Sequence, residues 1–184
     1  MSAIKSLLKR SSAAKVGRKA PTRRKLLELI AVAANAADHG KLQPWRLIEI
    51  RGKARQELGE AMATAAELGG SAFAKMVAKP LRAPLLIAVV VSHKPNKIKK
   101  VPLWEQDIAA AGVAHYLSLL LDEAGWGVFW RTGPHTRKEA VREFHHLDEH
   151  EELMGWLYVG NRTKTRKQRP QAMAHPEYKL TTFD

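Results

Sequence analysis

The stretch PLLIAVVV, residues 84–91, decides the fold of this chain. It is the longest strongly apolar run in the sequence, yet it is far shorter than the roughly 20 residues needed to span a bilayer. A short apolar run of this kind, rich in β-branched side chains and preceded by Pro84, is typical of a buried strand. We therefore expect residues 84–92 to form a central strand of a sheet.

Helical and strand patterns alternate on either side of this run. Thr22 is placed to cap a long helix with an apolar face, and Gly125 is placed to end the most apolar helix. The patterns predict helices at 2–10, 23–37, 53–67, 70–78, 103–124 and 136–145, and strands at 45–51, 84–92, 126–133 and 153–160. This order favours a single domain over residues 1–184, a sheet packed by helices, with a basic C-terminal tail at 161–184.

DHGKLQPWRLIEI, residues 38–50, joins the first long helix to the first strand. Its polar half, with a glycine and a proline, predicts a loop, and WRLIEI predicts a half-buried strand. The loop carries His39, Lys41 and Gln43 where a site could form. We expect Gln43 to be extended, because the residue before a proline avoids the helical region.

The composition restricts the class of protein. The chain has no cysteine, which excludes disulfides, thiolate metal sites and a cysteine nucleophile, and fits a reducing compartment such as the cytoplasm. Its first residues lack the long apolar core of a secretory signal. The net charge of +13 favours polyanionic partners, namely nucleic acid, anionic lipid or phosphorylated small molecules. A basic solvated surface without a partner explains the charge equally well.

The histidines do not match a known catalytic or metal-binding pattern. HHLDEHEE, residues 145–152, lacks the spacing of a motif such as HExxH, and adjacent histidines on a helix point to different faces. We expect no metal here, but a helix end whose polar side chains lie in water. His115 lies within the most apolar helix, and we expect a buried or interface histidine rather than a base. A serine-hydrolase elbow, a Walker A loop and a dinucleotide fingerprint are all absent from the sequence.

Two short stretches carry groups that suit a phosphorylated cofactor. In KRSSAAK, residues 9–15, Arg10 supplies a guanidinium and the next two serines supply hydroxyls, a grouping that suits a phosphate monoester. In WRTG, residues 130–133, a strand end offers an aromatic face, a cation and a hydroxyl. Either stretch alone is weak evidence, because solvated basic arms and core tryptophans are common.

Taken in order, these stretches resemble the nitroreductase family, in its compact bacterial branch. RSS near residue 10, AADHGKLQPWR, RAPLLIAVV, KVPLWEQD and GWGVFWRTG follow one another at similar spacing, so the resemblance covers nearly the whole chain. It implies an α+β fold with a central, mainly antiparallel sheet flanked by helices, in an intertwined homodimer. It also implies FMN at the subunit interface, NAD(P)H as hydride donor, and nitro, quinone or related conjugated acceptors reduced in a ping-pong cycle.

The resemblance further implies which residues hold the cofactor: Arg10, Ser11, Ser12, Asn35, His39, Trp130, Arg131 and Thr132. Arg10 would pair with the FMN phosphate, and the serines would donate to phosphate or ribityl oxygens. Asn35 and His39 would reach the flavin bound by the partner subunit, and the strand-end residues would line its other side. We predict no catalytic side chain, since hydride transfer belongs to the flavin.

The chain departs from the family pattern at two of these positions. Ser11 stands where the compact branch usually has a second arginine, and Asn35 stands where it can have another. Each lost charge-assisted bond is worth ~1.5–3 kcal/mol, which the arginine-rich stretch 162–169 could offset. The alternative function is a basic nucleic-acid-binding protein on a flavin-enzyme scaffold that has lost FMN, and the net charge supports it.

Overall fold

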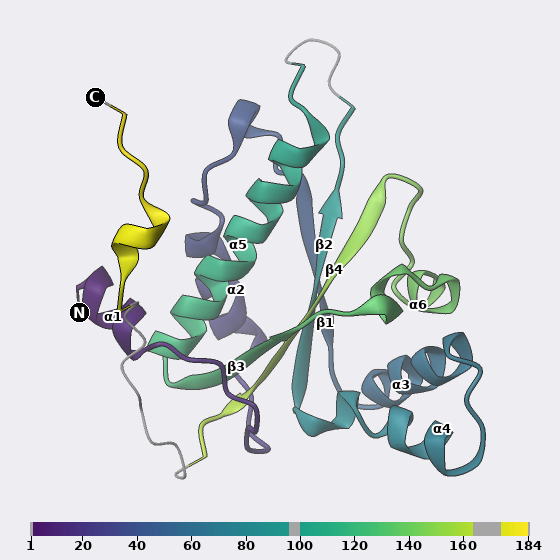
Figure 1. Ribbon diagram of the computed structural model, residues 1–184. Coiled ribbons are helices and arrows are strands. Elements are labelled where there is room, and N and C mark those ends of the chain that lie inside the picture. Colours follow the sequence, from purple (N-terminus) through teal and green to yellow (C-terminus); the bar gives the residue numbers. More distant parts are fainter. Residues whose placement is uncertain (1, 96–99, 164–173, 184) are drawn as a thin grey trace.

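The computed structural model describes residues 2–95, 100–163 and 174–183, which form a sheet covered by helices on both faces (Figure 1). The helices are α1 (Ala3–Lys9), α2 (Arg23–Ala33), α3 (Ala54–Ala65), α4 (Gly70–Val77), α5 (Leu103–Glu123) and α6 (Glu139–Phe144). The strands are β1 (Trp45–Ile50), β2 (Leu85–Ser92), β3 (Trp126–Arg131) and β4 (Glu151–Asn161). Short 3-10 turns are η1 (His39–Lys41), η2 (Pro80–Arg82), η3 (Pro134–Arg137) and η4 (Pro176–Lys179).

The sheet has the strand order β1-β2-β4-β3, and every neighbouring pair is antiparallel. The apolar run forms β2, which is central as predicted, and every residue from Leu85 to Val91 is at most 1% exposed. Because β2 and β4 occupy the middle, β1 and β3 are the edge strands. The predicted α+β class with an antiparallel sheet flanked by helices is confirmed.

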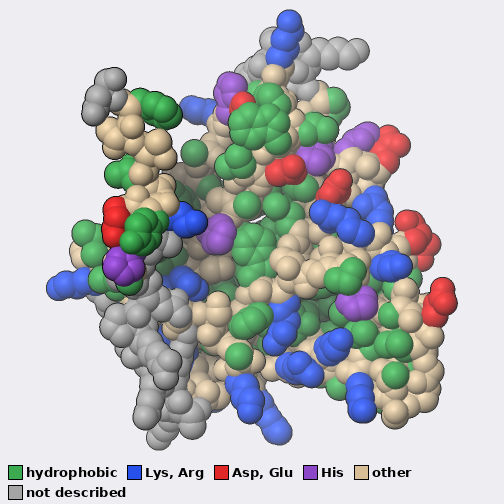
Figure 2. Space-filling model, viewed as in Figure 1, with side chains coloured by type: hydrophobic (Ala, Val, Ile, Leu, Met, Phe, Trp, Pro, Cys, Tyr) green, Lys and Arg blue, Asp and Glu red, His purple; other side chains and the backbone are tan. Residues whose placement is uncertain are grey.

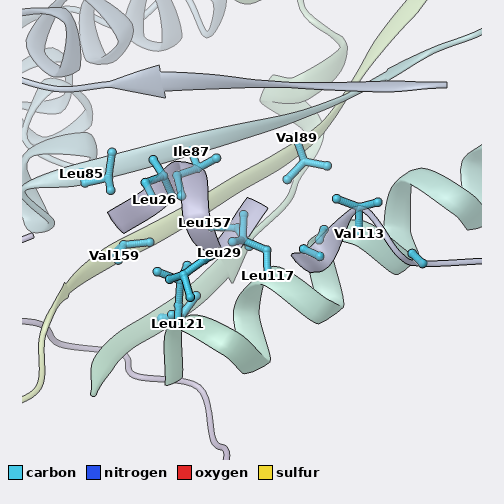
Figure 3. Close-up of a cluster of buried hydrophobic side chains, with 14 residues drawn as sticks. Leu26, Leu29, Leu85, Ile87, Val89, Val113, Leu117, Leu121, Leu157 and Val159 are labelled. Atoms are coloured by element: carbon cyan, nitrogen blue, oxygen red, sulfur yellow. The ribbon is translucent and has the colours of Figure 1, made fainter. Parts of the chain in front are cut away.

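Two apolar clusters explain why helices must cover both faces of the sheet. On one face, Leu29 of α2 and Leu117 of α5 pack against Ile87 of β2 (Figure 3). On the other face, Leu58 of α3 and Val141 of α6 belong to the second cluster, together with β2 and β4. Figure 1 shows α2 and α5 on one side of the sheet and α3, α4 and α6 on the other. No helix within the described ranges is long and apolar enough to cross a membrane.

The predicted helix ends are confirmed where a local signal defined them. The Thr22 hydroxyl accepts a hydrogen bond from the Lys25 amide at 3.2 Å, which caps α2. Gly125 follows α5 with a φ of +89°, a conformation that favours glycine. Where such a signal was missing, the bounds differ: α2 ends at Ala33 rather than 37, and β4 begins at Glu151 rather than 153.

The prediction that Gln43 is extended is wrong. Its φ is +47°, in the left-handed region. The Asp38 carboxylate explains this turn, because it accepts hydrogen bonds from the amides of Leu42 at 3.2 Å and Gln43 at 2.7 Å. The Gln43 carbonyl then accepts from the Trp45 amide at 2.8 Å, which leads into β1.

The expectation that residues 145–152 end a helix in water is wrong for two of them. His145 is 2% exposed, and its Nδ1 lies 2.6 Å from the Val141 carbonyl. Its Nε2 accepts from the Trp156 indole at 2.9 Å, so the neutral ring uses both nitrogens. Glu151 is 4% exposed and forms a bidentate pair with Arg46, with distances of 2.6 and 2.7 Å. In the described residues, no group of three or more His, Cys, Asp and Glu is placed to hold a metal ion.

The basic tail begins later than predicted, because its first two residues belong to the fold. Asn161 ends β4, accepts from the Gly17 amide at 2.7 Å and donates to the Lys19 carbonyl at 2.7 Å. Arg162 pairs with Asp122 near the end of α5. The rest of the stretch 162–169, apart from Thr163, lies outside the described residues.

We predict that His145 makes the protein less stable in mild acid. Burial lowers the pKa of His145 to about 4, below its ordinary value of 6.5. The unfolded chain therefore takes up this proton first as the pH falls, and about 3 kcal/mol of unfolding free energy is lost between pH 7 and pH 4. Urea unfolding of the His145→Gln variant should lack this component, because an amide can make both hydrogen bonds but does not titrate.

His146→Gln is the matched control, since His146 is the exposed neighbour of His145. It should keep the full pH dependence of the natural protein. The same slope in both variants would contradict a buried neutral His145.

Candidate functional site

A cavity of about 230 Å³ lies between the segment after α1, the helix α5 and the edge strand β3. The segment after α1 contributes Arg10, Ser11 and Ser12, and β3 contributes Val128 and Trp130. Four of the eight predicted cofactor contacts therefore come together in one place, although they lie more than a hundred residues apart in the sequence.

Backbone contact with the sheet holds the N-terminal segment at this cavity. The Ala13 amide donates to the Val128 carbonyl at 2.8 Å, on the free edge of β3. Beyond it, the chain lies so close to β4 that a Cβ added to Gly160 would be 2.5 Å from the Gly17 carbonyl oxygen. A Cβ on Gly127, opposite Gly160 in the ladder, would be 2.9 Å from Val16. The two glycines therefore permit the approach that fixes the segment carrying Arg10 (Figure 1).

The Arg10 guanidinium is a free cation within the part of the chain that the structure describes, where no carboxylate pairs with it. Its backbone amide donates to the Ser6 carbonyl at 2.8 Å and thereby ends α1. Ser11, directly after it, is 6% exposed and lines the same cavity. This segment therefore presents a cation and hydroxyls at the cavity, and such groups suit a phosphate.

Three polar residues of α5 complete the cavity: His115, Ser118 and Asp122. His115 is not buried within the chain, because it is exposed and packs edge-on against Trp130, with ring centroids 5.2 Å apart. Of the two predicted alternatives the buried one is therefore wrong, and the interface one stays a prediction. Asp122 is 7% exposed and paired with Arg162, so its negative charge is compensated and does not oppose an anion beside Arg10. The spacing of three and four residues places the three side chains on one face of α5. This spacing is visible in the sequence and could have indicated a polar face on the helix.

An irregularity in β4 orients Trp130. The pairing of β2 with β4 shifts register between Val89 and Val90, and the Met154 carbonyl accepts from the Trp130 indole at 3.2 Å. Gly155 next to it has a φ of +116°, and a Cβ there would lie 2.3 Å from the Arg131 carbonyl oxygen. A bulge and a glycine therefore set the direction of the indole.

The remaining predicted contacts lie elsewhere. Arg131 and Thr132 line a second cavity, which Trp130 also borders. Asn35 is exposed, and its side-chain amide donates to the Val32 carbonyl at 3.0 Å. His39 is also exposed and contacts Glu105 in the first turn of α5. Neither of these two side chains lines the Arg10 cavity of its own chain.

Comparison with known proteins places this arrangement in one family. The model of the nitroreductase family matches residues 7–161. The chain is 33% identical over 163 residues to the Escherichia coli K12 protein named "Putative NAD(P)H nitroreductase YdjA", covering 87% of this chain and 88% of that protein. A Haemophilus influenzae homologue with the same descriptive name, "Putative NAD(P)H nitroreductase", is 29% identical over the same shares.

Solved structures share the fold. A nitroreductase-like family protein from Bacillus cereus superposes with a TM-score of 0.84 at 22% identity, covering 100% of this chain and 97% of that chain. An FMN-dependent nitroreductase from Clostridium difficile superposes with a TM-score of 0.70, also at 22% identity and covering 98% of each chain. An α+β fold of nitroreductase type, with polar groups gathered at an edge strand, defines the class of protein. The chain belongs to the nitroreductase family and is an oxidoreductase.

We predict that Gly160→Ala displaces residues 11–17 from the sheet. The added Cβ would meet a backbone oxygen at 2.5 Å, so the segment must move. Hydrogen exchange should show reduced protection of the Ala13 and Gly17 amides, whereas the amides of β2 should stay protected.

Gly69→Ala is the control, because a Cβ at Gly69 would meet nothing within 4 Å. Unchanged protection of Ala13 and Gly17 in the Gly160→Ala variant would show that close packing on β4 does not position the segment.

Proposed function

We propose that the protein binds FMN at the Arg10 cavity and passes electrons from NAD(P)H to nitro, quinone or related conjugated acceptors. The observation that carries this proposal is the meeting of Arg10, Ser11 and Ser12 with Trp130 at one cavity. Family membership supports it, as do the names of the relatives, which describe NAD(P)H nitroreductases. The solved structures of similar fold include FMN-dependent nitroreductases.

The residues present fit the phosphate end of FMN. Arg10 offers a guanidinium without a carboxylate partner among the described residues, and Ser11 and Ser12 follow it. Asp122 is the acidic side chain in the lining, and Arg162 compensates it. The charge that remains is positive, as a phosphate requires.

The volume of the Arg10 cavity supports a site that is completed by a second chain. Small-molecule sites usually measure about 300–1,000 Å³, and this cavity measures about 230 Å³. We assign the remaining walls to a second chain. Asn35 and His39, which are exposed and lie away from the Arg10 cavity of their own chain, are the residues that we assign to the flavin of the partner subunit.

The helix α5 has an exposed apolar face that suits the dimer. Trp104 is 59% exposed, Ile108 60% and Tyr116 48%, and the spacing of four and eight residues places them on one side. Several large exposed apolar side chains on one side of a helix are typical of a protein interface. The buried face of the same helix, with Val113 and Leu117, packs on the sheet.

Bound FMN would supply the redox chemistry, taking a hydride from NAD(P)H and reducing the acceptor in a ping-pong cycle. The chain's own residues bind and orient it. Arg10 would hold the phosphate, the serines would donate to phosphate or ribityl oxygens, and the indole of Trp130 would offer an aromatic face, held by the Met154 carbonyl and by His115. No side chain is assigned as an acid or a base.

We predict that Arg10→Ala weakens FMN binding without unfolding the protein. Loss of one charge-assisted bond of ~1.5–3 kcal/mol should raise the Kd for FMN by about tenfold to a hundredfold. NAD(P)H oxidation with a quinone should fall at limiting FMN and recover when FMN is added in excess.

Lys9→Ala, which removes the exposed neighbouring charge, should leave both quantities unchanged. The proposal fails if the natural protein neither binds FMN nor oxidises NAD(P)H, and the phosphate assignment fails if Arg10→Ala binds FMN as the natural protein does.

We also predict that Ile108→Arg dissociates the dimer. A charge placed in the apolar face of α5 must be desolvated on association, which is unfavourable. Sedimentation equilibrium should show a dimer for the natural chain and a monomer for the variant, with lower FMN content. Leu81→Arg, at a side chain on η2 that is 44% exposed, is the control and should remain dimeric. A dimeric Ile108→Arg variant would place the interface elsewhere.

A further inference from the structure

A second cavity, of about 370 Å³, lies on the opposite face of β3 from the Arg10 cavity. Phe129 and Tyr158 in its wall belong to the apolar cluster under α3, whereas Val128 in the Arg10 cavity belongs to the cluster under α5. Its volume is within the range of small-molecule sites. Most of the residues that line this cavity are not among the predicted FMN contacts.

Basic side chains from separate elements converge on this cavity. Lys79 directly precedes η2, and Arg82 ends it. Arg131 comes from the end of β3, and His135 comes from η3. Figure 2, in the orientation of Figure 1, shows Lys and Arg side chains between β3 and α3, with a histidine beside them. Among the described residues, no Asp or Glu lines the cavity, and none pairs with Lys79, Arg82 or Arg131.

Two buried polar atoms at this cavity have no hydrogen-bond partner in the described part of the chain. They are Nε of Arg131 and Nδ1 of His135. Burial of an unsatisfied polar group is unfavourable, so such atoms mark a place where a ligand or water belongs. Burial lowers the pKa of His135, and the nearby charges of Lys79 and Lys138 lower it further. The ring is therefore neutral near pH 7, and the positive charge comes from the lysine and the two arginines.

Aromatic side chains form the rest of the wall. Trp130, Trp156 and Tyr158 line the cavity, and the Arg131 guanidinium lies over the Phe129 ring at 4.4 Å. Burial raises the pKa of Tyr158, so its hydroxyl stays protonated and can donate a hydrogen bond. Flat apolar walls beside guanidinium groups favour a ligand that has both a ring and an anionic group.

The geometry points to a binding site for a small aromatic carboxylate in this second cavity. Its carboxylate would accept hydrogen bonds from Arg82 and Arg131, since the guanidinium fork matches a carboxylate. Its ring would pack among the side chains of Phe129, Trp156 and Tyr158. This inference does not depend on FMN binding, because the two cavities lie on opposite faces of β3 and share only Trp130 in their linings.

Benzoate is the probe, and its binding to the full-length protein is measured by isothermal titration calorimetry. Benzoate should bind at least about tenfold more tightly than benzamide, which is neutral and of similar shape, and than acetate, which lacks the ring. Arg82→Gln should weaken benzoate binding by about tenfold or more. Lys75→Gln, which removes an exposed charge of α4 outside the lining, should change it less than about twofold.

Three results would overturn the inference: equal affinity for benzoate and benzamide, no effect of Arg82→Gln, or displacement of benzoate by saturating FMN. The last result would assign the cavity to the flavin site. If circular dichroism shows that Arg82→Gln does not fold, Lys79→Gln replaces it and should also weaken benzoate binding, by at least about threefold, because it removes a positive charge from the lining. Failure of FMN binding leaves this test intact, because benzoate binding is measured directly and not through activity.

Discussion

Burial of the two central strands on both faces is the constraint on which the structure depends. Every residue of Leu85–Val91 in β2 is at most 1% exposed, and the middle of β4 is similarly buried. Apolar side chains pointing to both sides require cover on both sides, so α2 and α5 pack on one face and α3, α4 and α6 on the other. Only the edge strands keep a free side. Polar groups that bind a ligand can therefore gather at β3, where one edge is not occupied by another strand.

Glycines, which have no side chain, shape the candidate site as much as its polar groups do. Gly127 and Gly160 leave room for residues 11–17 to lie against the sheet, which holds Arg10 at the cavity. Gly155, beside the bulge in β4, lets the Trp130 indole reach the Met154 carbonyl. Trp130 then borders a cavity on each face of the strand. One cavity has serines and an Arg10 guanidinium without a carboxylate partner among the described residues, and it suits a phosphate. The other, with guanidinium groups among aromatic rings, suits an aromatic anion.

Local signals in the sequence were enough to predict the helices and strands. The features that the sequence did not predict depend on contacts between residues that are far apart in the chain or in different elements. The apolar run predicted β2, and Thr22 and Gly125 predicted helix ends, because each signal acts within a few residues. The resemblance to the family predicted eight cofactor contacts, and the fold brings some of them together, with Arg10 and Trp130 at one cavity. The burial of His145 depends on its contact with Trp156 of β4, and the turn at Gln43 depends on Asp38. The second cavity joins η2, β3 and η3, and no sequence period links those segments.

The central claim is that FMN is held by the N-terminal segment against β3, between two copies of the chain. A crystal structure of the protein grown with FMN tests it most directly. We expect a dimer with the phosphate bound to the Arg10 guanidinium, the flavin ring beside Trp130, and His39 of the partner subunit in contact with the cofactor. A flavin bound away from Arg10, or one enclosed by a single chain, would show that the N-terminal segment and the dimer do not form the site.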